Sequence, residues 1–161
     1  MDADIKKERK PDAENFVCKI AASKKEIIQA LLLRRKVLVK EFHYSRYKDE
    51  PDKYDINAVI YVVKDRDKVV GTVRVRKESK GNAEEVSRRD VVYRIQRVAI
   101  DEKYRMTGVG SMLLQKAAKD FGKLCVMAPQ ETVSFYERYG FKKTGEVREG
   151  KFHAYYRMQN F

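Results

Sequence analysis

The sequence has no tryptophan, only two cysteines and only three prolines among its 161 residues. Cys18 and Cys125 lie in separate apolar stretches, and neither has an adjacent histidine that would activate it as a nucleophile. Two isolated cysteines do not make a disulfide framework or a metal site. We therefore expect both side chains to be buried as small hydrophobic groups, and we expect no metal centre.

Long hydrophobic runs are also missing. No stretch approaches the roughly 20 apolar residues of a membrane-spanning helix, and the first residues are polar and charged, unlike a secretory signal peptide. We therefore expect no membrane association and a cytoplasmic or nuclear location. A chain of 161 residues is long enough for one well-buried core and too short for two ordinary domains.

Positive charge dominates the composition, because 36 lysines and arginines face 24 aspartates and glutamates, a net charge of +12. Such a charge attracts polyanions, including nucleic acid, ribosomes and phosphorylated cofactors. The basic residues are spread along the chain, for example at 34–36, 74–80 and 88–89, and form no long basic tract. Two interpretations stay open at this point, a solvated basic surface and a dedicated nucleic-acid-binding face.

The spacing of apolar residues predicts one mixed α/β domain. Residues 1–14 are charged and contain Pro11, so we expect a flexible N-terminal tail followed by a domain over 15–161. The predicted strands span residues 15–22, 58–63, 69–76, 94–100, 124–127, 141–147 and 152–158, and the short turn 65–68 makes a hairpin of the second and third. With helices after the first, fourth and fifth strands, the expected order is β-α-β-β-β-α-β-α-β-β.

The first helix is predicted to begin after Ser23, which forms a capping box with Glu26. We expect its buried stripe to contain the large apolar residues Ile27, Ile28, Leu31, Leu32, Leu38, Val39 and Phe42. A second helix follows Gly110. A third covers 132–139, and Gly140 is expected to end it in the left-handed conformation.

The segment Arg105-Met-Thr-Gly-Val-Gly110, between the fourth strand and the second helix, is the most informative in the chain. A glycine-containing turn that enters a helix presents unpaired backbone N–H groups at the positive end of the helix dipole, which suits a phosphate or pyrophosphate. Without side chains, Gly108 and Gly110 let a ligand approach the backbone closely. The segment lacks the Lys-Ser/Thr pair of a Walker loop and the third glycine of a dinucleotide fingerprint. A plain strand-to-helix turn is the alternative.

Arg-x-x-Gly-x-Gly resembles the acyl-CoA pyrophosphate loop of the GNAT superfamily of N-acetyltransferases. Gln96-Arg-Val-Ala-Ile100, followed by Tyr104-Arg105, is similar to the family's fourth strand, and Ser134-Phe-Tyr-Glu-Arg-Tyr-Gly-Phe141 is similar to its Phe-Tyr-x-x-x-Gly-Phe signature. The resemblance covers nearly everything from Asn15 to Met158. It implies a single GNAT-type α/β domain, with a mixed and mostly antiparallel sheet flanked by helices, and acetyl-CoA as co-substrate.

The resemblance also implies which residues hold acetyl-CoA. In the family the loop amides bind the pyrophosphate, the fourth strand pairs with the pantetheine arm, and the signature tyrosine protonates the leaving thiolate. Carried onto this sequence, the cofactor-binding residues are Val98, Ala99, Ile100, Arg105, Met106, Thr107, Gly108, Val109, Gly110, Ser111 and Tyr136. Tyr136 is thus the expected catalytic acid; a core aromatic, packed with Phe135 and Tyr139, is the alternative.

A narrower resemblance is to the bacterial-type branch that includes the small-molecule glyphosate N-acetyltransferases. It rests on the segments 33–41, 52–55 and 71–76, and on Gly145-Glu146 with His153. It implies that His153 is the catalytic base and that arginines of the first helix and third strand, Arg34 or Arg35 and Arg74, lie near the substrate. We therefore assign Arg35, Arg74 and Gln96 to the acceptor site. A structural role for His153 and a solvated position for Arg35 are the alternatives.

The sequence departs from the family where many members place a glutamate base, because Arg94 and Gln96 stand on the fourth strand. The expected activity is direct transfer of acetyl from acetyl-CoA to an amine, without an acyl-enzyme. A nucleic-acid- or ribosome-binding module and an acyl-CoA sensor, each on a catalytically degenerate scaffold, are the alternatives. Small-molecule, peptide and lysine amines all stay open as acceptors, and the positive charge favours a small or acidic one. The sequence does not define an oligomeric state.

Overall fold

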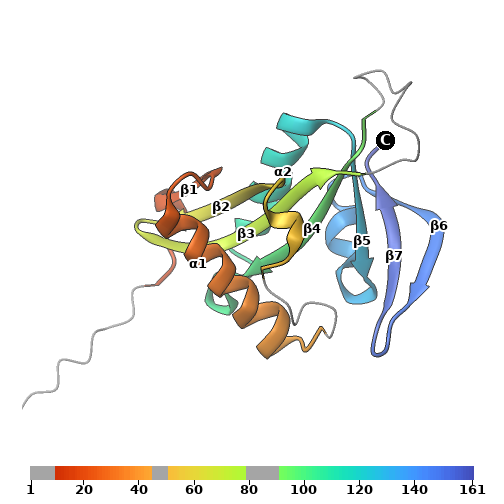
Figure 1. The fold of residues 1–161 in the computed structure, drawn as a ribbon, viewed down its shortest axis with the longest axis horizontal. Coiled ribbons are helices and arrows are strands. Elements are labelled where there is room, and N and C mark those ends of the chain that lie inside the picture. The colour runs from red at the N-terminus through yellow and green to blue at the C-terminus, as the bar shows by residue number, and fades with distance from the viewer. Residues whose placement is uncertain (1–9, 45–50, 79–90) are drawn as a thin grey trace, which may run out of the picture.

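The computed structural model describes residues 10–44, 51–78 and 91–161 of the chain. They form one seven-stranded sheet in the order β1-β2-β3-β4-β5-β7-β6 (Figure 1). The strands are β1 (Phe16–Ile20), β2 (Val59–Asp65), β3 (Lys68–Lys77), β4 (Tyr93–Ile100), β5 (Leu124–Pro129), β6 (Lys142–Glu149) and β7 (Ala154–Gln159). Every pairing is antiparallel except that of β4 with β5. The predicted fold class, element order and β2–β3 hairpin are confirmed.

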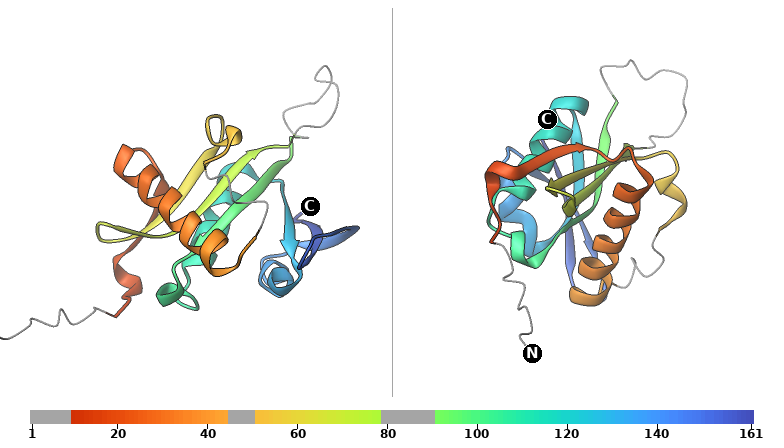
Figure 2. Two further views of the ribbon diagram at one scale, coloured as in Figure 1. Left: turned by 60° about the horizontal axis from the view of Figure 1, so that its bottom comes forward. Right: turned by 90° about the vertical axis from the view of Figure 1, so that its left-hand side faces the viewer.

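Helices cover both faces of the sheet (Figure 2). On one face, α2 (Val109–Phe121) and α3 (Val133–Glu137) pack on alternate residues of the central strands, including Tyr61 and Val63. On the other face, α1 (Lys24–Arg34) packs on the intervening residues, including Ile60 and Val62. This division follows from the two-residue repeat of a strand, which turns successive side chains to opposite faces.

The first helix begins as predicted but buries a different stripe. Ser23 Oγ accepts a hydrogen bond from the backbone N–H of Glu26, and the capping box is complete. The predicted stripe is wrong, however, because Ile28 and Leu32 are 47% and 62% exposed. Of that stripe Leu38 is buried as predicted, and the other buried residues are Glu26, Ala30, Leu33, Arg34 and Val37.

Two physical reasons account for the different stripe. Small Ala30, fully buried, faces the sheet, and Arg34 satisfies its charge on Asp55, with Nη1 2.7 Å from Oδ1. The chain then continues as a π-helix, Arg35–Glu41, whose wider turn changes the spacing that a regular helix would have kept.

The β4–β5 ladder is short, and this shapes the molecule. Only Tyr93, Arg94 and Ile95 pair with β5, so the two strands part from Gln96 onward. Figure 1 shows β2–β4 running obliquely while β5, β7 and β6 stand nearly upright. On its other side β4 has a bulge: its register with β3 shifts between Thr72 and Arg74, and Arg97 has a positive φ of 56°. The parting and the bulge lie at the same level of the sheet.

The remaining expectations meet the described residues only in part. Residues 1–9 of the predicted tail lie outside those residues, and Ala13–Asn15, at the end of the predicted tail, form a short 3-10 helix. Cys125 is buried and Cys18 half-buried, and both are free thiols. In the described part of the chain, no helix is long and apolar enough to cross a membrane.

Candidate functional site

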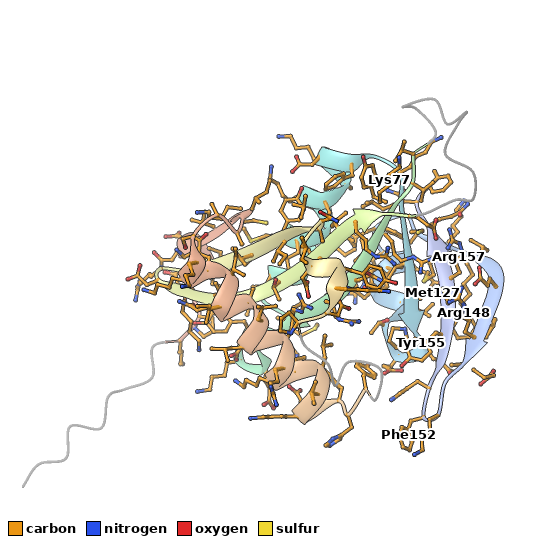
Figure 3. The ribbon with its side chains drawn as sticks, viewed as in Figure 1. Lys77, Met127, Arg148, Phe152, Tyr155 and Arg157 are labelled. Carbon is orange, nitrogen blue, oxygen red and sulfur yellow. The ribbon has the colours of Figure 1, made fainter. Side chains whose placement is uncertain are left out.

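A cleft of about 870 Å³ lies where β4 and β5 part. It is lined by the second half of β4, the end of β5, the loop before α2, and α3. Phe42, Tyr44, Asp52 and Tyr54, which follow α1 in the chain, also line it. Met127 and Arg148, labelled in Figure 3, line it from the β5–β7–β6 side. The cleft therefore brings together segments from most of the chain.

The glycine loop opens directly into this cleft. Gly108 is the N-cap of the 13-residue helix α2, with φ of 94° and no side-chain cap, so the first N–H groups of α2 have no capping side chain. A Cβ on Gly108 would meet nothing within 4 Å, whereas one on Gly110 would lie 2.9 Å from Ile100 Cδ1 and 3.1 Å from Phe135 Cζ. Gly108 thus leaves room for a ligand, and Gly110 allows α2 to pack against α3 and β4. The geometry is that of an anion site at a helix N-terminus.

The other loop residues divide between lining and support. Met106, Gly108, Gly110 and Ser111 line the cleft. Thr107 and Val109 do not, because the Thr107 hydroxyl donates to the carbonyl of Tyr104 and Val109 is buried in the core. Met106, with φ of 63°, holds a conformation that glycine adopts more readily.

Arg105, predicted to hold the cofactor, turns its guanidinium to the protein. Both terminal nitrogens pair with the carboxylate of Glu41, and Nη2 also donates to the Ile100 carbonyl at 3.1 Å. The guanidinium carbon lies 5.1 Å from the ring centre of Phe42. The Glu41 carboxylate raises the pKa of Arg105, and Arg105 lowers that of Glu41. Arg105 therefore fixes the loop to the end of the π-helix.

Val98 and Ile100 of β4 line the cleft, whereas Ala99 faces α1 and is buried there. Tyr136, from α3, faces the same cleft with its side chain 4% exposed. Its ring packs against Phe135 and Phe141, at 5.2 and 5.6 Å between ring centres. Tyr136 is thus a packed aromatic that also lines the cleft, and its role as the catalytic acid stays a prediction.

An ion-pair network forms one wall of the cleft around Arg74 and Gln96. Arg74 Nη1 lies 2.5 Å from Asp52 Oδ1, and Arg74 Nη2 donates to Gln96 Oε1 at 2.9 Å. Gln96 Oε1 also accepts from Arg76, and Arg97 Nη2 lies 2.8 Å from Asp52 Oδ2. Burial opposes ionisation of Asp52, but the hydrogen bond and charge of Arg74 lower its pKa overall. Asp52 is therefore a carboxylate with both oxygens engaged.

Arg35 does not take part in this network. It is exposed and lies outside the cleft lining, so its position does not support the predicted contact with the acceptor. Its neighbour Arg34 is the buried arginine of the helix and pairs with Asp55. The sequence alone does not distinguish two adjacent arginines on a helix whose spacing then changes.

His153 lies just before β7, and it does not line the cleft. Its Nδ1 is 3.3 Å from Glu131 Oε1, and its ring is 5.2 Å from that of Tyr44. Both Glu131 and Tyr44 do line the cleft. Sequence reasoning missed these two residues and Glu41. The sequence does contain one signal for Glu131: it stands two residues after Pro129, which ends the strand before the signature helix.

Arginines outnumber carboxylates in the cleft lining within the described part of the chain. Six arginines line it, Arg74, Arg94, Arg97, Arg105, Arg138 and Arg148, against two carboxylates, Asp52 and Glu131. Such a lining favours anionic ligands. In the same residues, no group of three or more histidine, cysteine or acidic side chains is arranged to hold a metal ion.

Comparisons with known proteins bear on the family and the fold. The family described as an acetyltransferase (GNAT) domain matches residues 57–143, more than half of the chain. ElaA from Escherichia coli has the same fold, with a TM-score of 0.71, 20% identity, and coverage of 91% of this chain and 98% of that protein. The structure of an acyl-CoA N-acyltransferase from Pseudomonas aeruginosa has a TM-score of 0.67 and 22% identity, with coverage of 91% of this chain and 99% of that protein.

A third solved structure is that of Arabidopsis thaliana Naa50 in complex with the bisubstrate analogue CoA-Ac-MVNAL. It has a TM-score of 0.67 and 18% identity, over 90% of this chain and 97% of that one. No curated protein matches the sequence. At these identities the solved structures establish a shared fold.

Proposed function

This chain belongs to the GNAT acetyltransferase family, and we propose that it transfers acetyl directly from acetyl-CoA to an amine acceptor. The observation that carries the proposal is the cleft between β4 and β5, which joins a helix N-terminus open at Gly108 to a buried tyrosine, Tyr136. One end suits a pyrophosphate and the other a reacting thioester.

The proposed donor site uses backbone groups more than side chains. The N–H groups from Met106 to Ser111 would hold the pyrophosphate, and β4 beyond Ile95, where it no longer pairs with β5, would offer its edge to the pantetheine arm. The acetyl carbonyl would then lie near the bulge at Arg97, where a backbone N–H can stabilise the negative charge that develops on oxygen.

The proposed chemistry forms one C–N bond and breaks one C–S bond. Acetyl-CoA supplies an activated acyl group, and Tyr136 would give a proton to the departing sulfur. The amine must lose a proton before it attacks. We assign His153 a part in that step. Because its own side chain lies outside the cleft lining, it would act through Glu131, which it contacts and which does line the cleft.

We further propose that the acceptor is a small amine with an anionic group, in keeping with the sequence resemblance to the glyphosate N-acetyltransferase branch. The six lining arginines support this proposal. Arg74 is engaged by Asp52 and Gln96, and Arg94 by Glu78, so both would shape the wall. Exposed Arg138, and Arg148, whose partner Glu146 is itself 41% exposed, are better placed to meet an added anion.

The test has two stages. Calorimetry should detect acetyl-CoA binding, and thiol release should then be followed with O-phosphoethanolamine, L-aspartate, glyphosate, spermidine and a peptide with a free N-terminus. We expect the anionic amines to give higher kcat/KM than spermidine. Lack of acetyl-CoA binding would overturn the proposal, and binding without turnover of any amine would favour a sensor. Tight RNA binding that falls steeply with salt, without acetyl-CoA binding, would favour the nucleic-acid module.

A further inference from the structure

Glu131 occupies a fixed position at the end of β5. It lies in the 3-10 turn Gln130–Thr132, between Pro129 and the start of α3. The Thr132 hydroxyl donates to the Pro129 carbonyl at 2.8 Å, and Val133 is anchored in the core. The backbone that carries Glu131 is therefore held on both sides, and its side chain lines the cleft.

Three distant segments meet at one oxygen of this carboxylate. The hydroxyl of Tyr44, a buried residue, donates to Glu131 Oε1 at 2.9 Å, and His153 Nδ1 lies 3.3 Å from the same atom. The rings of His153 and Tyr44 pack edge to face, at 5.2 Å between centres. Glu131 thus connects the segment after the π-helix to the β6–β7 turn.

The second oxygen is available to a ligand. Across the described residues, Oε2 of Glu131 has no hydrogen-bond partner, and the side chain is 45% exposed. Asp52, the other cleft carboxylate, has both oxygens on arginines. Gln96 lies on β4, the strand where many family members have a glutamate base. Its Oε1 accepts from Arg74 and Arg76, and an amide does not take up a proton. Of the two carboxylates that line the cleft in the described residues, Glu131 is therefore the one with an oxygen available to a ligand.

We propose that Glu131 is the group that binds the acceptor ammonium and accepts its proton, and that His153 is a positioning residue that acts through Glu131. This inference rests on the proposed acetyl transfer. In the step, an N–H bond of the ammonium breaks and an O–H bond forms at Glu131 Oε2. The freed nitrogen lone pair forms the C–N bond as the C–S bond breaks.

The remaining protons then balance. The thiolate takes a proton from Tyr136, and the acylated nitrogen gives up its second proton, which restores Tyr136. The proton on Glu131 leaves to solvent past His153, whose side chain is 30% exposed beside the exposed Phe152. The net result is an amide, a free thiol and one proton released.

Glu131→Gln is the sharpest test, because the amide oxygen still accepts from Tyr44 but takes up no proton. With the most rapidly acetylated amine of the panel above, we expect kcat to fall roughly 10²–10⁴-fold while acetyl-CoA affinity and the melting temperature stay near wild type. Glu137→Gln, on the exposed side of α3 and outside the cleft lining, removes the same charge and should leave kcat unchanged.

The role of His153 is tested by non-additivity. His153→Asn should lower kcat less than Glu131→Gln does, and the double variant should be no slower than Glu131→Gln alone. A Glu131→Gln enzyme with wild-type kcat, or a full extra loss from His153→Asn in that background, would overturn this inference and leave acetyl transfer standing. A wild-type protein that acetylates no amine of the panel would overturn both.

Discussion

Gly108, the N-cap of α2, has open space where any other residue would carry a side chain. We predict that Gly108→Asp weakens acetyl-CoA binding far more than Gly108→Asn. The two side chains have the same shape, and Asn and Asp both tolerate a positive φ. Only Asp adds a negative charge, and repulsion between unit charges ~5 Å apart is on the order of 3 kcal/mol at an effective dielectric of about 20, or roughly 100-fold in Kd.

Calorimetric titration of both variants with acetyl-CoA measures this difference directly. High salt should narrow it, because the repulsion is electrostatic and the loop is open to solvent. Equal affinities for the Asp and Asn variants would mean that the pyrophosphate does not lie at Gly108.

At the scale of elements, the Glu41–Arg105 pair joins the π-helix that follows α1 to the loop that precedes α2. We predict that Glu41→Gln weakens acetyl-CoA binding several-fold and lowers stability by no more than about 1 kcal/mol. Both side chains are about one-third exposed, so the pair contributes little to overall folding. The pair acts mainly on the loop before α2, because Glu41 holds the Arg105 guanidinium where it also donates to the Ile100 carbonyl.

Glu102→Gln is the matched control, because Glu102 is exposed in the same loop and its side chain acts on Arg105 through its charge. Its backbone carbonyl, which accepts from the Arg105 N–H, is unchanged by the substitution. Calorimetry gives the affinities, and hydrogen exchange of residues 104–108 shows whether the loop has loosened. Identical behaviour of the two variants would assign the effect to charge, without a role for the contact.

Elements were predictable where the signal is local. The capping box at Ser23, the β2–β3 hairpin and the glycine loop each depend on a few neighbouring residues, and the structure confirms them. The buried stripe of α1 could not be predicted in this way, because it depends on the sheet that Ala30 faces and on the π-helix that follows. The contacts Arg105–Glu41 and Tyr44–Glu131 join residues 64 and 87 positions apart. No pattern within a helix or strand encodes such pairs. The sequence therefore predicts residues that the structure places in the cleft, such as Gly108 and Tyr136, but not the contacts across it, and the roles of these residues stay predictions.

For the molecule as a whole, the decisive feature is that two parts of one sheet meet at only three residue pairs of β4 and β5. Glu78, just after β3, reinforces this junction. It pairs with Arg94 of β4 and, at 2.7 and 2.8 Å, with both terminal nitrogens of Arg157 of β7. Figure 3 shows Arg157 on β7, on the side of the molecule where β5 and β7 stand. Glu78 therefore holds the closed end of the cleft, opposite the end where the strands part.

This junction predicts how stability depends on pH. The hydrogen bond from Arg157, outweighing the effect of burial, lowers the pKa of Glu78 from 4.5 to about 2. Between these values the unfolded chain binds the proton more readily than the folded one. The stabilisation from Glu78 is therefore complete above pH 4.5 and is lost as the pH falls towards about 2. It amounts to up to about 3 kcal/mol, since each pKa unit corresponds to about 1.4 kcal/mol.

We predict that Glu78→Gln lowers the free energy of unfolding at pH 7 and that its difference from wild type shrinks as the pH falls below 4.5. Urea unfolding at pH 7, 4.5 and 3 measures this convergence. Glu146→Gln is the control: Glu146 also approaches Arg157, at 3.9 Å, but is 41% exposed, so its removal should cost little at any pH. A Glu78→Gln deficit that stayed constant with pH would mean that Glu78 acts by packing alone. If the deficit converges as expected, Glu78 stabilises the junction between β4 and β5 as a carboxylate, through its ion pairs with Arg94 and Arg157.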